Sequence, residues 1–321
     1  MTPYKIGLVL GGGFAKGSYQ MGFLKALTRY IPAESISCIY ASSIGTINGY
    51  ALSCGKLGEA EHLYKNIDFK NIANFVKLAY KDRIFSKMVD MIAKEGDKIS
   101  IPLTFSLCRF PKLEKLYVTF LGENSKECTD ALKASIAFPI ATKPAKFLKK
   151  HYIDGGAMDN IPVRKLTEDT DCNLIIVLHC DTRYIPPQEI YKDDKIIMDL
   201  DVSVELASPL EGFDIRHKTL VKMFEEGEKY GEKVCDYVFK GFPDIEFDVL
   251  RERVNEFLIS DYQTRRKRAS FDTFYTFLNQ VYYALFEDDD KIFDKKFAKQ
   301  LKQKEKEEMQ RLLNSSDDNS E

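Results

Sequence analysis

The first fifty residues alternate short apolar runs with glycine-rich turns and stretches of helical periodicity. Residues 5–10 are an apolar run that ends in three glycines, which is typical of a buried strand followed by a loop. Apolar residues then recur at helical spacing between residues 18 and 31, and residues 37–52 repeat the order of strand, turn and helix. This order predicts an α/β fold with a mostly parallel central sheet.

Further signals extend this pattern. Residues 174–180 form a continuous apolar run, which indicates a central parallel strand. Thr129 is the expected N-cap of a short helix that Pro139 stops. We expect variable helices within 57–100, strands at 103–108 and 116–121 joined as a hairpin, a helix at 129–137, and strands at 147–153 and 174–180.

The composition changes near residue 210. Helical patterns dominate after this point, and the tail from residue 287 is highly charged. The helical patterns lie at 220–239, 247–258 and 271–286. We therefore predict an α/β domain at 1–210, a helical C-terminal lobe packed on it at 211–290, and a charged helical or disordered tail at 291–321.

Charge and cysteine usage exclude several classes of protein. The 321 residues carry a formal net charge of −2, which argues against broad nucleic-acid binding. The seven cysteines are odd in number and include no C-x-x-C pair, so neither a disulfide framework nor a zinc site is indicated. With no recognisable signal peptide at the start, we expect a cytoplasmic protein. The sequence carries no signal for the oligomeric state.

One uncharged stretch raises the question of a membrane span. No charged residue lies between Glu34 and Lys56, a length that approaches a transmembrane helix. Its interior, residues 41–49, is rich in serine, glycine and asparagine, which do not suit a lipid-facing helix. A buried strand, a tight turn and a buried helix explain the stretch better.

Ser43 lies in a candidate nucleophile elbow. A serine hydroxyl needs an adjacent base and must project clear of the backbone, as in the strand-to-helix turn G-x-S-x-G. Residues 41–45 read Ala-Ser-Ser-Ile-Gly, with an apolar strand before and a helix after. Considered alone, this pentapeptide fits equally well a helix start that is capped by Ser42 or Ser43.

The glycine loop at residues 11–17 suits a different task. Ester hydrolysis passes through an oxyanion, and glycines allow main-chain N–H groups to be aimed at it. The phosphate-loop pattern fails because Lys16 precedes Gly17, and the dinucleotide pattern fails because Lys16 stands where the last glycine belongs. A plain strand–helix connection remains the alternative.

Asp154 follows an apolar strand and precedes two glycines. A carboxylate at the end of a strand in an α/β sheet lies where active sites collect, and it can orient a serine hydroxyl and accept its proton. An ordinary Asp-Gly turn is the alternative.

Together, four segments resemble the patatin-like phospholipase family. Residues 8–22 resemble its oxyanion-hole segment, 41–48 its nucleophile elbow, 134–139 its small-residue segment, and 152–162 its aspartate motif with a trailing Asn-x-Pro. They occur in the family's order within about residues 5–180. The resemblance implies a three-layer α/β fold whose catalytic domain is the part at 1–210. The remaining motif positions are Gly11, Lys16, Gly17, Ala41, Gly45, Gly155 and Gly156.

The resemblance implies a Ser43–Asp154 dyad that needs no histidine, metal or cofactor. Two positions depart from the family pattern: Ala41 replaces the first elbow glycine, and Phe14 stands where the third loop glycine belongs. Phenylalanine does not adopt a positive φ cheaply, so the oxyanion donors can be displaced by one residue. We rank Gly12, Gly13 and Phe14 as the donors.

Other polar residues receive structural interpretations. Lys16 is expected to be a solvated or paired cation, and Asp159 lies off the position of the aspartate motif. His179 or His217 would keep the order Ser, Asp, His of a rival triad. We disfavour this triad because only one strand precedes the elbow and the glycine loop lies upstream of it.

The resemblance implies a lipid acyl hydrolase of the phospholipase A or lysophospholipase type that forms an acyl-serine. An acyltransferase with the same dyad and an inactive lipid-binding module are the alternatives, the latter because of Ala41 and Phe14. The expected partner is a lipid or another acyl ester. Peripheral membrane contact through the basic run 265–268 is a further hypothesis, although a solvated loop fits that run better.

Overall fold

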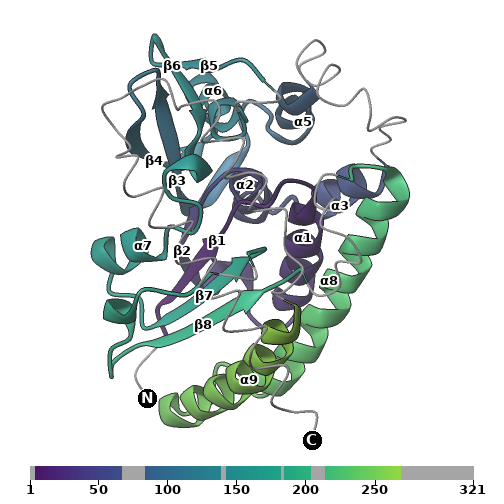
Figure 1. Ribbon diagram of the computed structural model, residues 1–321, viewed down its shortest axis with the longest axis vertical. Helices are drawn as coiled ribbons and strands as arrows, with labels where there is room; N and C mark the ends of the chain where they lie inside the picture. The colour runs from purple at the N-terminus through teal and green to yellow at the C-terminus, as the bar shows by residue number, and fades with distance from the viewer. Residues whose placement is uncertain (1–3, 67–83, 139–141, 182–183, 204–213, 269–321) are drawn as a thin grey trace, which may run out of the picture. The chain divides into compact units, whose positions relative to one another are not determined.

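The computed structural model describes residues 4–66, 84–138, 142–181, 184–203 and 214–268 (Figure 1). The predicted helix at 271–286 and the predicted tail at 291–321 lie outside the described residues.

A single mixed sheet organises the described residues. Its strands are β1 (Ile6–Leu10), β2 (Ile36–Ala41), β3 (Lys98–Phe110), β4 (Glu114–Glu123), β5 (Ala145–Phe147), β6 (Lys150–Asp154), β7 (Leu174–His179) and β8 (Ile196–Asp201). The order along the sheet is β5-β6-β3-β2-β1-β7-β8, and β4 pairs with β3. The five strands β3, β2, β1, β7 and β8 pair in parallel with one another in this order. Strands β4 and β6 run antiparallel to β3. The expectation of a mostly parallel sheet is therefore confirmed.

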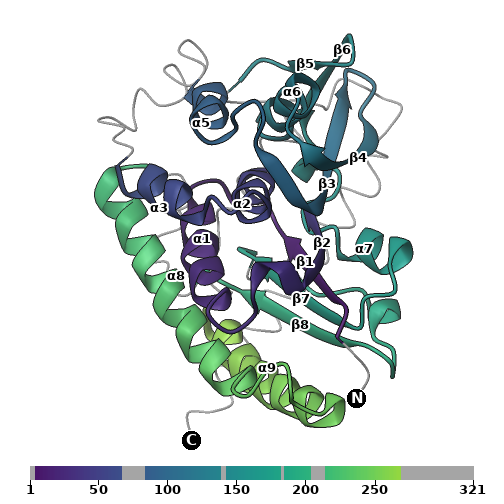
Figure 2. The same cartoon turned by 180° about the vertical axis from the view of Figure 1, so that it is seen from behind.

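Helices cover both faces of this sheet. They are α1 (Gly17–Leu27), α2 (Ile44–Ser53), α3 (Leu57–Asn66), α5 (Ile84–Ile92), α6 (Lys126–Ser135), α7 (Val163–Asp169), α8 (His217–Val238) and α9 (Phe247–Arg268). Helices α1, α2, α3 and α8 lie on one side and α7 lies on the other (Figures 1 and 2). The three layers expected from the sequence are present.

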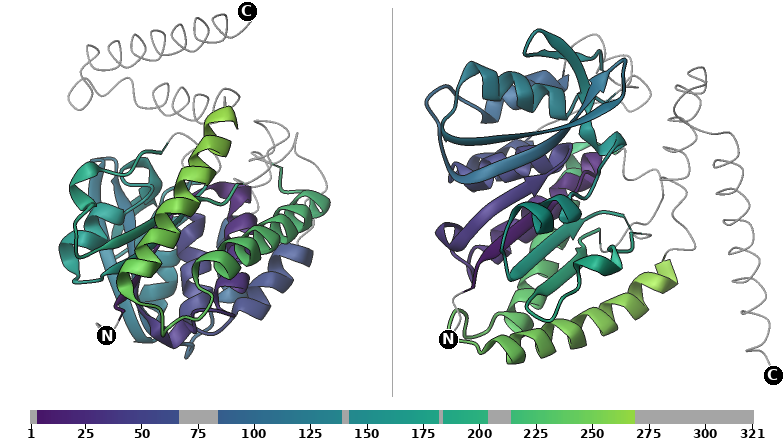
Figure 3. Two further views of the ribbon diagram at one scale, coloured as in Figure 1. Left: turned by 90° about the horizontal axis from the view of Figure 1, so that it is seen from below. Right: turned by 90° about the vertical axis from the view of Figure 1, so that its left-hand side faces the viewer.

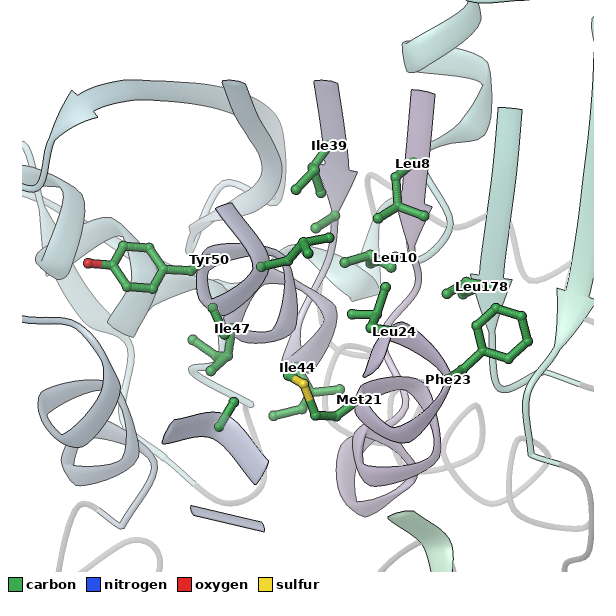
Figure 4. Close-up of a cluster of buried hydrophobic side chains, with 14 of the residues drawn as sticks. Leu8, Leu10, Met21, Phe23, Leu24, Ile39, Ile44, Ile47, Tyr50 and Leu178 are labelled. Carbon is green, nitrogen blue, oxygen red and sulfur yellow. The ribbon is translucent and has the colours of Figure 1, made fainter. Parts of the chain in front are cut away.

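Strand alternation divides the apolar core between the two faces. Leu8 and Leu10 of β1 point into the larger cluster with residues of α1 and α2 (Figure 4), whereas Val9 points into a smaller cluster with Val163 and Leu166 of α7. Such two-sided burial explains why β1 is uniformly apolar. The carboxyl ends of the parallel strands meet at one edge, where the glycine loop and the elbow follow β1 and β2.

Helix α8 packs against α1 with unusually little space between the backbones. A Cβ added to Gly22 of α1 would lie 2.0 Å from the carbonyl oxygen of Phe224, and one added to Gly227 of α8 would lie 2.1 Å from that of Tyr19. Helix α9 contacts β8, as the right-hand view of Figure 3 shows. The described part of the range predicted as a lobe, 211–290, thus contains two helices in contact with the α/β layers.

Two local predictions are wrong. The N-cap of α6 is Ser125, whose Oγ accepts a hydrogen bond from the Cys128 N–H at 3.2 Å, and not Thr129. The single strand expected at 147–153 is a hairpin, because Leu148 and Lys149 both have positive φ and turn the chain between β5 and β6.

The uncharged stretch between Glu34 and Lys56 forms β2 and α2, as we expected. Within the described ranges, none of the helices combines the length and the apolar character needed to cross a bilayer.

Candidate active site

Ser43 occupies the sharp turn between β2 and α2. Its backbone has φ 52° and ψ −132°, a conformation that non-glycine residues adopt only when the surroundings enforce it. Hydrogen bonds on either side hold the turn: Ser42 N–H donates to the Leu10 carbonyl at 3.0 Å, and Thr46 N–H donates to the Ser43 carbonyl at 2.9 Å. The Ser43 side chain makes no capping hydrogen bond to α2, so it remains available to other groups.

The Ser43 hydroxyl donates to Asp154 Oδ2 at 2.5 Å. Asp154 ends β6, which pairs with β3 in antiparallel fashion and places Asp154 opposite Leu107. The other carboxylate oxygen, Oδ1, accepts from Gly156 N–H at 2.8 Å. The structure therefore brings together the two side chains that the sequence singled out, across 111 positions of the chain.

Burial controls the acidity of Asp154. Its side chain is only 5% exposed, and desolvation raises its pKa from 3.8 to about 6. The hydrogen bonds from Ser43 and from the Gly156 N–H oppose this rise because they stabilise the charged form. The carboxyl group thus loses its proton near neutral pH and is still a stronger base than an exposed aspartate.

The glycine loop lies directly against Ser43. A Cβ on Gly12 would come within 2.8 Å of Ser43 Cβ and 2.3 Å of Asn160 Oδ1, so only glycine fits at this position. The loop amides differ in their partners. Gly11 N–H donates to the Leu178 carbonyl at 2.9 Å, and Gly12 N–H is shared between the main-chain and side-chain oxygens of Asn160, each at 3.2 Å.

Asn160 is the residue of the site that our sequence reasoning missed. Besides accepting from Gly12 N–H, its side-chain amide faces the Gly12 carbonyl at 3.4 Å. It therefore joins the loop that follows Asp154 to the glycine loop. The available signal was the Asn-x-Pro that trails the aspartate motif, which we treated as a marker and not as a contact.

Phe14 corrects one expectation. We expected phenylalanine to avoid the positive φ of the glycine that it replaces, but its φ is 56°. A left-handed conformation costs a residue with a Cβ about 1–2 kcal/mol. The Phe14 ring lies near that of Phe138, with a centroid distance of 6.2 Å. Gly13 has φ −177°, which any residue can adopt.

Three motif glycines are explained by close approach. A Cβ on Gly45 would lie 2.3 Å from the Leu10 carbonyl oxygen, and one on Gly17 would lie 2.5 Å from the Ile44 side chain. On Gly155, it would lie 2.2 Å from the Ser106 carbonyl oxygen. These glycines allow the glycine loop, the elbow and the aspartate turn to converge.

Two further motif positions are Gly156 and Ala41. A Cβ on Gly156 would lie 2.8 Å from Asn160 Oδ1, so this glycine adjoins the same asparagine. Ala41 is fully buried in β2, paired with Leu10 on one side and Phe105 on the other. Because this is ordinary strand backbone, alanine serves where the elbow pattern has glycine.

Lys16 is fully buried, which excludes a solvated role. Its ammonium group donates to the Cys180 carbonyl at 3.2 Å. It is therefore a structural cation beneath the glycine loop.

Among the described residues, neither histidine of the rival triad contacts Ser43 or Asp154. His179 is buried in β7, where Nε2 lies 3.1 Å from Asp199 Oδ1 and Nδ1 accepts from Asp181 N–H at 3.1 Å. His217 is an exposed residue at the start of α8. Asp159 accepts a hydrogen bond from the Tyr117 hydroxyl. Among the contacts of the described residues, the acidic partner of Ser43 is Asp154.

The family model of the patatin-like phospholipases matches residues 8–167, the range that contains Ser43, Asp154 and the glycine loop. The chain therefore belongs to the patatin-like phospholipase family.

Two solved structures are similar to this chain. VipD from Legionella pneumophila is 11% identical with a TM-score of 0.41, and the match covers 91% of this chain and 81% of that chain. The ExoU–SpcU complex from the type III secretion system of Pseudomonas aeruginosa gives a match of 14% identity with a TM-score of 0.40. It covers 83% of this chain and 61% of that chain.

Proposed function

We propose that this protein is a serine-dependent lipid acyl hydrolase in which Ser43 is the nucleophile and Asp154 is the proton acceptor. The family supports lipid acyl hydrolysis in general. The observation that carries the specific proposal is the hydrogen bond from Ser43 Oγ to a buried carboxylate whose pKa is raised to about 6. A weakly nucleophilic hydroxyl requires such a base within hydrogen-bond distance.

The reaction proceeds in two halves. Ser43 Oγ attacks the acyl carbonyl as its proton passes to Asp154 Oδ2. The tetrahedral intermediate collapses to an acyl-serine, and the alcohol or lysolipid leaves with the proton from Asp154. Water then gives a proton to Asp154 and attacks the acyl-serine, and the proton returns to Ser43 as the fatty acid leaves. The carboxylate thus acts twice, first on the serine and then on water.

The oxyanion requires main-chain donors close to Ser43. The Gly12 N–H, one of the three donors expected from the sequence, already donates to Asn160, so Gly13 is the better candidate for the loop donor. Within the described part of the chain, the N–H groups of Gly13 and Ile44 have no acceptor. Ile44 is the first residue of α2, and the amide after a nucleophile commonly supplies one donor. Each donor typically contributes roughly 3 kcal/mol to the transition state; Phe14 is the third candidate.

Site-directed variants and covalent labelling test the dyad. Ser43→Ala and Asp154→Asn are compared with wild type on a soluble short-chain ester, and a fluorophosphonate probe is used to identify the labelled serine by peptide mapping. Ser37→Ala is the matched control because Ser37 is exposed on the same strand, β2. We expect loss of turnover in both dyad variants and labelling at Ser43. Full turnover in both variants, or a label on another serine, would refute the proposal.

The transacylase alternative differs from a hydrolase in the molecule that attacks the acyl-serine. A transacylase passes the acyl group to an alcohol, and product analysis with added lysolipid separates it from a hydrolase. The alternative of an inactive lipid-binding module depends on the two departures from the family pattern, Ala41 and Phe14. Ala41 fits regular strand backbone and Phe14 adopts the positive φ of a glycine, so neither departure favours loss of activity.

A further inference from the structure

Two hairpin ends extend beyond the edge of the sheet that holds the dyad. Asp154 lies opposite Leu107, and the β3–β6 pairing continues for three residues to Phe110 opposite His151. At about 3.3 Å per residue, this pair lies roughly 10 Å past Asp154 along the strand. The β3–β4 turn and the β5–β6 turn follow at the same end, and Figure 1 shows β5 and β6 at the top of the view.

Among the residues that the structure describes, no helix covers one face of this extension. Phe147 and Tyr152 point toward α6, with which they form part of the larger core. Strand alternation places their neighbours Lys146 and His151 on the opposite face. The register confirms this, because Lys146 pairs with His151 and His151 pairs with Phe110. These three side chains form an exposed row across β5, β6 and β3.

Basic residues dominate both turns. Segments 109–115 and 143–151 contain seven lysines and arginines against one carboxylate, although the whole chain carries a net charge of −2. That carboxylate, Glu114, is paired with Arg109 at 2.8 Å. Lys146, Lys149 and Lys150 are exposed, and no carboxylate of the described residues lies within ion-pair distance of them. A local positive field of this kind attracts an anionic surface.

The β5–β6 turn also presents an apolar tip. Leu148 is 57% exposed and has φ 46°, and Lys149 has φ 62°. A two-residue turn with two positive φ values favours Asn-Gly. Leucine and lysine are therefore unfavourable choices for the turn, and their side chains need another explanation. An apolar side chain beside cations matches the boundary between lipid head groups and acyl chains.

We propose that these two hairpin ends dock the protein on anionic phospholipid membranes and hold the edge that bears Ser43 toward the lipid. The docking surface is the tip of the two hairpins and consists of Phe110, Lys112, Lys146, Leu148, Lys149 and Lys150. Lys150 pairs with Phe147 and therefore lies on the face opposite to that of Lys146. An anionic bilayer fits it better than an acidic protein does, because an exposed leucine lies among the cations and can enter the boundary between lipid head groups and acyl chains. The inference rests on the proposed lipid hydrolase function and adds the surface through which the enzyme meets its substrate.

Vesicle binding tests this surface with the full chain. Wild type is sedimented with phosphatidylcholine vesicles that contain or lack phosphatidylserine, and binding only to the anionic vesicles is expected. The triple variant Lys146→Glu, Lys149→Glu, Lys150→Glu should partition at least about 100-fold more weakly, since the loss of each cation near the surface costs about a factor of five and each added carboxylate is repelled. Leu148→Asn should bind about tenfold more weakly, and asparagine suits the turn, so the fold is preserved.

A matched triple variant shows whether a loss of vesicle binding depends on where the lysines lie or only on the net charge of the protein. Lys229→Glu, Lys233→Glu and Lys240→Glu reverse three exposed lysines on and just after α8, away from the hairpin ends, and should retain most of the binding. Wild type that ignores phosphatidylserine, equal losses in both triple variants, or loss confined to charge reversal at 265–268 would each overturn the proposal.

Turnover of a soluble ester keeps the two proposals distinct. The hairpin variant should hydrolyse the soluble ester like wild type and lose activity only on anionic vesicles. Ser43→Ala should lose both activities and still bind vesicles. Esterase activity without vesicle binding refutes only the docking surface, whereas vesicle binding without Ser43-dependent turnover refutes only the hydrolase.

Discussion

Replacing Asp154 with asparagine should abolish turnover and make the protein more stable at neutral pH. The buried carboxyl group has a pKa near 6 in the folded protein against 3.8 for the free group. The difference corresponds to about 3 kcal/mol that the folded state loses when the group ionises. Asparagine carries no charge, and its amide retains the size and polarity needed to contact Ser43 and the Gly156 N–H. We expect a gain of about 1–3 kcal/mol and a rise in melting temperature of about 5 °C at pH 8.

The ionisation of Asp154 determines how the stability difference between the variant and wild type changes with pH. Between about pH 4 and pH 6 the folded protein binds the Asp154 proton and the unfolded chain does not, so this group's contribution to stability falls as the pH rises through that window. Above pH 6 the contribution stays at its low value. The asparagine variant lacks this contribution, so its advantage over wild type should be largest at pH 8 and should shrink toward pH 4.

Calorimetry or circular dichroism at pH 5, 6.5 and 8 measures the difference, since the chain has no tryptophan for fluorescence. Asp236→Asn on the exposed side of α8 is the control for the chemical change, and its melting temperature should match wild type at each pH. An Asp154→Asn variant that is less stable than wild type at pH 8, or whose advantage does not change with pH, would refute the reasoning about burial.

Three further outcomes follow from the site. Turnover of a soluble ester should fall about tenfold per pH unit below pH 6 and level off above it, because the base must be ionised; a flat profile from pH 4.5 to 8 would exclude Asp154 as that base. Asn160→Ala should lower kcat by about tenfold or more with a smaller effect on KM, because it removes both side-chain hydrogen bonds to Gly12 and leaves only the main-chain one to position the glycine loop; unchanged kinetics would remove its positioning role. Gly155→Ala should destabilise the fold by about 1–3 kcal/mol because its Cβ would strike the Ser106 backbone, whereas Gly58→Ala in open space should not; equal melting temperatures would contradict the packing.

The predictable parts of the fold are those whose local pattern had one interpretation. Strand β1 and residues 174–178 of β7 are apolar because both of their faces are buried, and the sequence shows this directly. Strand β8 escaped notice because Asp199 and Asp201 interrupt its apolar run, yet both are buried. Asp199 lies 3.1 Å from His179 of β7, a residue from elsewhere in the chain, so no local pattern reveals its burial.

In the candidate site too, some residues could be predicted from local sequence motifs and others could not. Ser43 and Asp154 could be selected from motifs, and the structure places them in contact. The burial of Lys16 could not be foreseen, since lysine is almost never fully buried and its carbonyl partner, Cys180, is 164 positions away. The role of Asn160 depends on the conformation of Gly12, which spacing alone does not determine.

The close contact of α1 with α8 limits how this catalyst can be moved or trimmed. The residues that the family model matches end at 167, yet Gly22 meets the backbone of Phe224, and the Gly11 amide needs the carbonyl of Leu178. A fragment cut at residue 167 would keep Ser43 and Asp154 but expose the apolar flank of α1 to water. A graft of the active centre into another scaffold must therefore bring the later strand and the long helix with it.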